Sequence, residues 1–151
     1  MAIKRVVVAI DGSEVSYGII DYALHYAEME KDVELLFIHV REPLGHRRVS
    51  FAGLADFSPN ESDLREEFEK FIKDQIKMSG LPKPLMTIWV AEGIPYDEIL
   101  SFAEKKNADL IMIGHRGLGN LERFFLGSVA AKVVAHAPCS VYVYRPKEDR
   151  P

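Results

Sequence analysis

The chain has little cysteine and no long apolar run. Cys139 is the single cysteine among 151 residues, so no disulfide can form within the chain and a reducing compartment, the cytoplasm, is expected. The apolar runs are shorter than the roughly 20 residues that span a bilayer, so no membrane partner is expected. The opening segment MAIKRVVVAIDGS lacks a small-residue cleavage site and is interpreted as a strand rather than a signal peptide.

An excess of basic charge is also absent. The formal net charge is −4, whereas proteins that follow nucleic-acid backbones neutralise many phosphates with basic surfaces. Nucleic acid is therefore not expected as a partner. The hydrophobic fraction of 48% is enough for the core of one domain. We expect that domain to cover residues 1–146, followed by a short charged tail at residues 147–151.

Strands and helices alternate along the sequence. Apolar and β-branched runs predict five buried strands at residues 3–10, 32–40, 84–93, 108–114 and 140–145. Apolar residues at helical spacing predict helices at residues 14–30, 61–79, 96–106 and 128–136. Such alternation is typical of a parallel sheet with helices on both faces. Residues 41–59 keep no period and are predicted as a long loop, whose part at residues 45–59 has no assigned role.

Glycine is concentrated in one segment, GHRGLGNLERFFLGSVA, which holds four of the ten glycines. Gly114 closes the fourth predicted strand, Gly117 follows it, and Gly127 with Ser128 opens the last predicted helix. A helix N-terminus offers unpaired amides and a positive dipole end, and glycine lets an anion approach the backbone. We interpret these residues as two halves of a phosphate cradle. The Lys of a P-loop and the dinucleotide-binding fingerprint after the first strand are both missing.

The ends of the predicted strands indicate where a ligand would bind. In parallel α/β folds, ligands lie beyond the carboxyl ends of the strands, where the strand order reverses. AIDGS, HVRE and GHRG stand at such ends. Asp11 is the plausible carboxylate there, although Asp-Gly-Ser is also ordinary turn chemistry. Ser13 is predicted as a helix N-cap, and Ser128 as both a cap and a phosphate ligand.

The spacing Gly114-x2-Gly117-x9-Gly127-Ser128, with AIDGS after the first strand and the closing HAPCSVYVYR, resembles the universal stress protein family, specifically its nucleotide-binding branch. The resemblance covers essentially the whole chain. It implies a single-domain, Rossmann-like three-layer α/β sandwich with a five-stranded parallel sheet in the order 3-2-1-4-5. It also implies ATP with Mg²⁺ or Mn²⁺ as the ligand, and a homodimer paired through residues 140–145.

The resemblance further implies a set of ligand contacts. They are Ala9, Asp11 and Val40 toward adenine and ribose, Ile113 and Gly114 on the ribose side, and Gly117, Gly127, Ser128 and Val129 around the phosphates. Ala130 stands where many nucleotide binders have a second hydroxyl, so one hydrogen bond of about 1 kcal/mol, roughly tenfold in affinity, is missing. Arg116 has a donor fork that can reach phosphates, with a solvated loop residue as the alternative. His115 is predicted as a solvated loop residue.

Together these features predict an ATP-binding regulatory stress-response protein whose nucleotide-bound state is the signal. Two alternatives stay open: a dimeric interaction protein that binds no nucleotide, and a slow ATPase. Phosphoryl transfer needs a metal, a positioned water and charge stabilisation, and no convergent Lys-Asp set stands out. No catalytic residue is therefore assigned. His39 is predicted as a strand histidine, and Cys139 as buried and inert.

Overall fold

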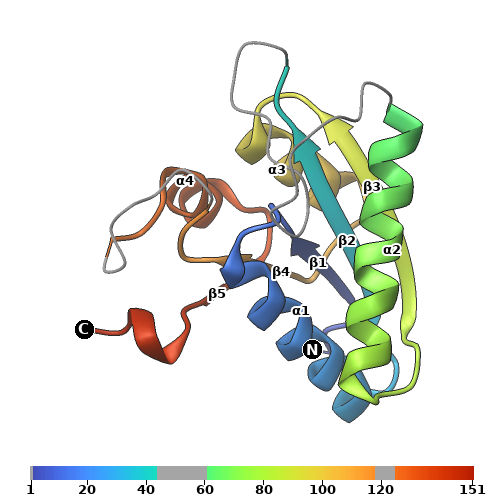
Figure 1. The fold of residues 1–151 in the computed structure, drawn as a ribbon. Helices are drawn as coiled ribbons and strands as arrows, with labels where there is room; N and C mark the ends of the chain where they lie inside the picture. The colour runs from blue at the N-terminus through green and yellow to red at the C-terminus, as the bar shows by residue number, and fades with distance from the viewer. Residues whose placement is uncertain (1, 44–60, 118–124) are drawn as a thin grey trace.

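The computed structural model describes residues 2–43, 61–117 and 125–151 (Figure 1). The strands are β1 (Arg5–Ala9), β2 (Glu34–Arg41), β3 (Leu85–Glu92), β4 (Leu110–Gly114) and β5 (Ser140–Tyr144). The helices are α1 (Glu14–Glu30), α2 (Glu61–Ser79), α3 (Pro95–Lys105), α4 (Ser128–His136) and the short 3-10 helix η2 (Lys147–Asp149). All strand pairs are parallel, and their order β3-β2-β1-β4-β5 confirms the predicted Rossmann-like sheet.

Element boundaries follow the local signals in the sequence. Helices α1, α2 and α4 begin and end where predicted. Helix α3 begins one residue earlier, at Pro95, because proline suits the first helical turn. Strand β1 is shorter than predicted, although Ile10 still donates its N–H to the Ile38 carbonyl at 2.9 Å. Helix η2 was not predicted. It forms within residues 147–151, which were predicted as a charged tail.

The helices cover the two faces of the sheet in pairs, α1 with α2 and α3 with α4 (Figure 1). Side chains alternate along the central strand: Val6 and Val8 face α1 and α2, whereas Val7 faces α3 and α4. All three are 0% exposed, and burying each valine contributes about 1.5–3 kcal/mol. No helix in the described ranges is both long enough and apolar enough to cross a membrane.

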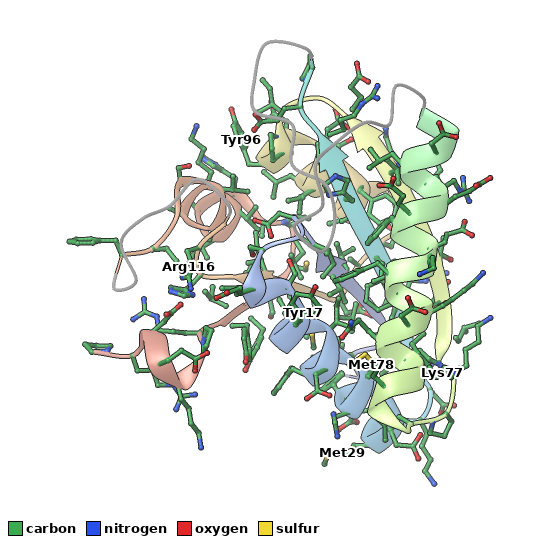
Figure 2. All side chains as sticks on the ribbon, in the orientation of Figure 1. Tyr17, Met29, Lys77, Met78, Tyr96 and Arg116 are labelled. Atoms are coloured by element: carbon green, nitrogen blue, oxygen red, sulfur yellow. The ribbon has the colours of Figure 1, made fainter. Side chains whose placement is uncertain are left out.

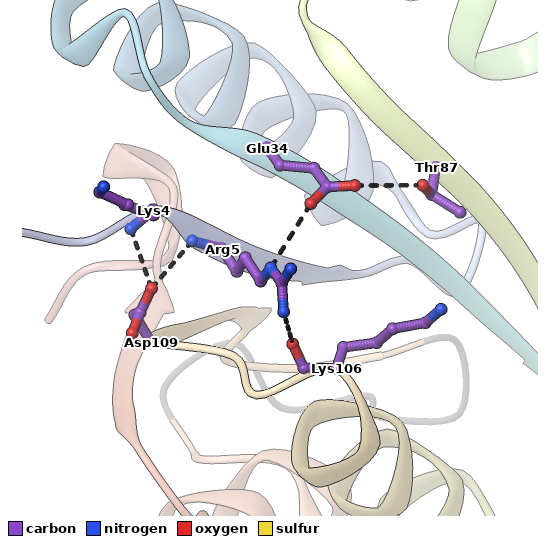
Figure 3. A network of polar contacts seen from close by, with 6 residues as sticks. All are labelled: Lys4, Arg5, Glu34, Thr87, Lys106 and Asp109. Atoms are coloured by element: carbon purple, nitrogen blue, oxygen red, sulfur yellow. Dashed lines mark hydrogen bonds and ion pairs between the residues drawn. The ribbon is translucent and has the colours of Figure 1, made fainter.

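A polar network closes the amino ends of the strands (Figure 3). The Asp109 carboxylate accepts the backbone N–H groups of Lys4 at 2.9 Å and Arg5 at 3.0 Å. These two hydrogen bonds lower the pKa of Asp109, and the bond from Arg5 has the larger effect. The Arg5 guanidinium donates to the Lys106 carbonyl at 2.9 Å and lies 3.7 Å from the Glu34 carboxylate. The network thus joins β1, β2 and the segment before β4.

Strand β5 lies at one edge of the sheet and packs its tyrosines on α1. Tyr142 stacks on Tyr22 with ring centroids 4.4 Å apart and planes at 8°. A Cβ atom on Gly18 would overlap the Tyr144 hydroxyl, so this helix position requires glycine. The helix-facing side of β5 is therefore covered, and the hydrogen-bonding edge beyond it has no strand partner among the described residues.

Candidate functional site

The candidate site lies at the carboxyl ends of β1, β2 and β4. Ala9 is in register with Ile38 of β2, and Val8 is in register with Met112 of β4. Asp11 comes two residues after Ala9, and Val40 comes two residues after Ile38. Asp11 and Val40 therefore lie at neighbouring strand ends. The chain runs from β1 to β2 on one side, and β4 pairs with β1 on the other. This is the reversal of strand order at which α/β folds bind ligands.

Asp11 is fixed by the start of α1. Its Oδ1 atom accepts the backbone N–H of Ser13 and the hydroxyl of Ser16, each at 2.9 Å. Gly12 has φ 82°, which allows the tight turn between strand and helix. The carboxylate is therefore held before any ligand arrives. Sequence reasoning missed Ser16, although a serine on the buried face of an amphipathic helix was a usable signal.

The prediction of Ser13 as the N-cap of α1 is confirmed for the residue but not for its hydroxyl. Ser13 is the N-cap residue by position, but its side chain makes no capping hydrogen bond. The Ser13 Oγ atom is buried and has no hydrogen-bond partner in the described part of the chain. Because Asp11 Oδ1 takes the Ser13 N–H, the carboxylate orders this turn.

Two glycines bring β4 close to α1 and Asp11. A Cβ atom on Gly117 would lie 2.5 Å from Asp11 Oδ2, and one on Gly114 would lie 2.6 Å from Val15 Cγ1. Real Cβ atoms essentially never approach so closely. The chain after β4 therefore passes directly against the Asp11 carboxylate, and a larger residue at position 117 would have to displace Oδ2. Both glycines have a packing reason, and their contacts with a ligand stay predictions.

Helix α4 begins beside the same strand end. The Gly127 N–H donates to the His115 carbonyl at 2.6 Å. Gly127 is the N-cap residue, and Ser128 is the first helical residue and exposed, so the prediction that Ser128 caps the helix is wrong. The first helical hydrogen bond joins the Ala131 N–H to the Gly127 carbonyl. The N–H groups of the first turn therefore have no partner within the helix.

The other predicted contact residues of α4 differ in burial. Val129 is half-buried, whereas Ala130 is 2% exposed and packs in the core between α3, α4 and the sheet. Ala130 therefore offers a backbone amide to the site, and its methyl group faces the core. Ile113 is also buried in that core. Gly119 and residues 45–59 lie outside the described residues.

His115 and Arg116 are held by the C-terminal helix η2. The prediction of His115 as a solvated loop residue is therefore wrong, and the alternative of a solvated Arg116 is excluded, whereas its contact with phosphates stays a prediction. Asp149 Oδ2 lies 2.6 Å from Arg116 Nε and 3.4 Å from His115 Nε2. The side chains of His115 and Asp149 are 0% and 1% exposed. The hydrogen bond to Asp149 is the main reason that the pKa of Arg116 is raised, with smaller effects from the charges of Asp149, Glu14 and Asp11. Sequence reasoning missed Asp149 because it lies in a short, highly charged segment.

Two further ionisable side chains have structural explanations. His39 is buried, and its ring Nδ1–H donates to the Ile10 carbonyl at 3.0 Å. Burial lowers the pKa of His39, so its neutral form is favoured. Cys139 is half-buried rather than buried as predicted, and burial raises the pKa of its thiol. A raised pKa keeps the unreactive thiol form.

The described residues contain no group of three His, Cys, Asp or Glu side chains that could hold a metal ion. A divalent ion at this site would take its ligands mainly from a bound phosphate chain, as Mg²⁺ commonly does, with Asp11 as the nearby carboxylate. The geometry thus combines one fixed carboxylate, a glycine held against it and the amide-rich start of α4. This arrangement can hold a polar ligand with an anionic end.

Known proteins resemble the chain over nearly its full length. A model of the Universal stress protein family matches residues 2–145. A universal stress protein of Methanocaldococcus jannaschii is 37% identical, with 97% of this chain and 85% of the relative covered. A solved universal stress protein in complex with cAMP has a TM-score of 0.68 at 23% identity, covering 96% of this chain and 98% of its own. A universal stress protein from Archaeoglobus fulgidus in complex with dAMP has a TM-score of 0.62 at 22% identity, covering 95% and 98%.

Proposed function

The chain belongs to the universal stress protein family, and on this premise we propose that it binds ATP at the carboxyl ends of β1, β2 and β4. The observation that carries the proposal is the close approach of Gly117 to Asp11, where a Cβ atom on the glycine would lie 2.5 Å from Oδ2. It places backbone amides next to a fixed carboxylate at the reversal of strand order. The relatives solved with cAMP and dAMP support an adenine nucleotide as the class of ligand.

The nucleoside end of ATP fits the β1 and β2 side of the site. Backbone groups at Val40 face the adenine, with Ala9 at the neighbouring strand end. Asp11 Oδ1 already accepts two hydrogen bonds, and Oδ2, the atom nearest Gly117, accepts from a ribose hydroxyl. Ile113 and Gly114 complete the ribose side from β4.

The phosphate end fits the start of α4. The amides of Ser128, Val129 and Ala130 have no partner within the helix, and the helix dipole contributes about 0.3–1 kcal/mol for an anion there. The Ser128 hydroxyl is exposed and adds a donor. Mg²⁺ or Mn²⁺ would accompany the phosphates and take its ligands mainly from them. Bound ATP supplies the negative charge that this arrangement of amides favours.

We further propose that the protein is a cytoplasmic homodimer and that its ATP-bound state is the regulatory signal. Strand β5 is an edge strand, and an edge of unpaired backbone groups pairs readily with a second copy. The covered helix-facing side of β5 leaves its outer edge as the surface for that pairing. A dimer that binds no nucleotide and a slow ATPase are the alternatives that the experiment separates.

Isothermal calorimetry of the purified protein with ATP and Mg²⁺ tests the proposal, using Gly127→Leu as the variant. Gly127 has φ −62° and ψ 155°, which any residue adopts, so the variant is expected to fold. Its side chain would occupy the phosphate end, and ATP affinity is expected to fall at least about tenfold. Ala135→Leu, an exposed site at the other end of α4, is the matched control with unchanged affinity.

Each result has a defined meaning. Absence of ATP binding by the unmodified protein favours the nucleotide-independent dimer. Gly127→Leu with unchanged affinity shows that the phosphate end is assigned wrongly. Release of phosphate from ATP during the titration, followed over hours, favours the slow ATPase.

A further inference from the structure

We propose that Asp149 is a positioning residue of the nucleotide site: from η2, its carboxylate holds His115 and Arg116 so that the chain at Gly117 keeps the shape that binds phosphates. The inference rests on the proposed nucleotide site and adds a residue to it. In Figure 2, Arg116 lies between α4 and the C-terminal turn that carries Asp149.

The first step concerns the charge of Asp149. Its side chain is 1% exposed, and Arg116 Nε donates to Oδ2 at 2.6 Å. His115 Nε2 lies 3.4 Å from the same oxygen. A carboxylate removed from water is strongly destabilising unless it is paired, so the folded protein keeps these contacts. Helix η2 is therefore bound to residues 115 and 116 and is not a solvated tail.

The second step connects residues 115 and 116 to the site. The His115 N–H donates to the Tyr144 carbonyl at 2.9 Å, and the His115 carbonyl accepts the Gly127 N–H at 2.6 Å. The same residue thus joins the end of β5 to the start of α4. Gly117 follows one residue after Arg116 and lies against Asp11. Asp149 consequently fixes the two side chains that precede the glycine at the phosphate end.

The third step concerns the direction of the Arg116 guanidinium. Arginine has five N–H donors in a rigid fork, and the Nε–H is directed to Asp149. This bond fixes the plane of the fork, and therefore the direction in which the two Nη groups face. Arg116 directly precedes Gly117, which lies against Asp11, so Arg116 is next to the site in the chain. The charges of Glu14 and Asp11 also contribute to its raised pKa. Asp149 itself acts only through its neighbours.

The test is calorimetry with ATP and, separately, with adenosine, on Asp149→Asn. Asparagine keeps the shape but removes the charge. ATP affinity is expected to fall about tenfold or more, the size expected for a lost charged hydrogen bond, while adenosine affinity stays unchanged. Glu148→Gln, an exposed neighbour in the same helix, is the matched control. A purely structural role would lower the melting temperature and leave the ratio of the two affinities as it was.

A second variant covers the case in which Asp149→Asn does not fold. Arg116→Lys keeps the positive charge but loses the Nε donor, and it is expected to lower the same affinity ratio. An unchanged ratio of ATP affinity to adenosine affinity in the folded variant, or tighter ATP binding, overturns the role of Asp149. The proposed function is kept in that case as long as the unmodified protein binds ATP. If the unmodified protein binds adenosine but not ATP, the proposed ATP-binding function and the role of Asp149 both fail.

Discussion

The two ends of the sheet use charged side chains in different ways. At the amino ends, Arg5 and Glu34 are 49% and 28% exposed and lie 3.7 Å apart, and Asp109 is satisfied by backbone N–H groups. At the carboxyl ends, the His115 and Asp149 side chains are 0% and 1% exposed. Exposed pairs contribute little to stability, whereas buried charges must be paired in a defined geometry. We therefore expect the amino end to tolerate substitution of its charges better than the carboxyl end, where the paired charges are buried.

Glycine follows the same division. Gly114 and Gly117 are both at the carboxyl end, where a Cβ atom would meet Val15 or Asp11 at less than 3.0 Å. The amino-end network instead consists of charged side chains that bond backbone N–H groups, one backbone carbonyl and one another (Figure 3). Gly18, against Tyr144, makes such an approach elsewhere, but two of the close approaches occur where we place the ligand. The difference between the ends is testable by matched changes at each of them.

The largest expected effect comes from comparing Asp11→Ala with Asp109→Ala. Asp11→Ala removes the acceptor of two hydrogen bonds at 2.9 Å, so we expect a loss of about 2 kcal/mol in unfolding free energy. ATP affinity is expected to fall at least about tenfold. Asp109→Ala is expected to cost about 1 kcal/mol and to leave ATP affinity unchanged. Urea denaturation and calorimetry measure both quantities, and equal losses of affinity in the two variants would remove the distinction between the ends.

An intermediate effect is expected from pH, through His39 and Asp109. The pKa of His39 is lowered in the folded protein, so the unfolded chain binds its proton first. Protonation of His39 in the unfolded chain destabilises the folded state. This effect is absent above about pH 6.5, the ordinary pKa of histidine, and grows as pH falls from there toward the pKa of His39 in the folded protein. Asp109 has a lowered pKa, so its stabilising contribution is present above about pH 3.9 and is lost as pH falls below it.

Variants of His39 and Asp109 distinguish the contributions of these two residues to the pH dependence of stability. Denaturation midpoints between pH 7 and pH 5 are expected to fall less for His39→Asn than for the unmodified protein. Asp109→Asn is expected to follow the unmodified protein in that window and to differ from it only in stronger acid. A His39→Asn variant with the same decline between pH 7 and pH 5 would contradict the assignment.

The smallest effect is expected for Glu34→Gln at the amino end. The carboxylate lies 3.7 Å from Arg5 Nε and both side chains contact solvent, so the expected loss of unfolding free energy is about 0.5 kcal/mol or less. ATP affinity is expected to stay unchanged. Because the pair is screened by salt, denaturation at low and high ionic strength measures it. A loss of more than about 1 kcal/mol would show that this end is also sensitive to its charges.

The sequence predicted the fold well because fold class depends on local periodicity. Apolar spacing and terminal signals placed α1, α2 and α4 at their observed bounds. The strand order that the family resemblance implied places the ends of β1 and β4 side by side, and Asp11 and Gly117 meet just beyond those ends. Ligand contacts themselves, including those of Val40 and Ser128, stay predictions.

The missed features depend on contacts between distant residues. Asp149 lies 33 positions from Arg116, and a charged segment gives no local sign that one of its carboxylates is buried. The prediction of a solvated His115 is wrong for the same reason. Ser13 is the N-cap residue of α1 as predicted, but the Asp11 carboxylate rather than the Ser13 hydroxyl accepts a backbone N–H there. The N-cap of α4 is Gly127 rather than Ser128. Local pattern does not decide which of two adjacent residues begins a helix.

The Arg116–Asp149 pair also constrains how related sequences can diverge. Loss of Arg116 alone removes the 2.6 Å hydrogen bond to a buried carboxylate, whereas loss of Asp149 alone removes the acceptor of a partly exposed guanidinium. A lineage that abandons the pair is therefore expected to neutralise position 149 before, or together with, position 116. We therefore expect positions 116 and 149 to be substituted together among related sequences.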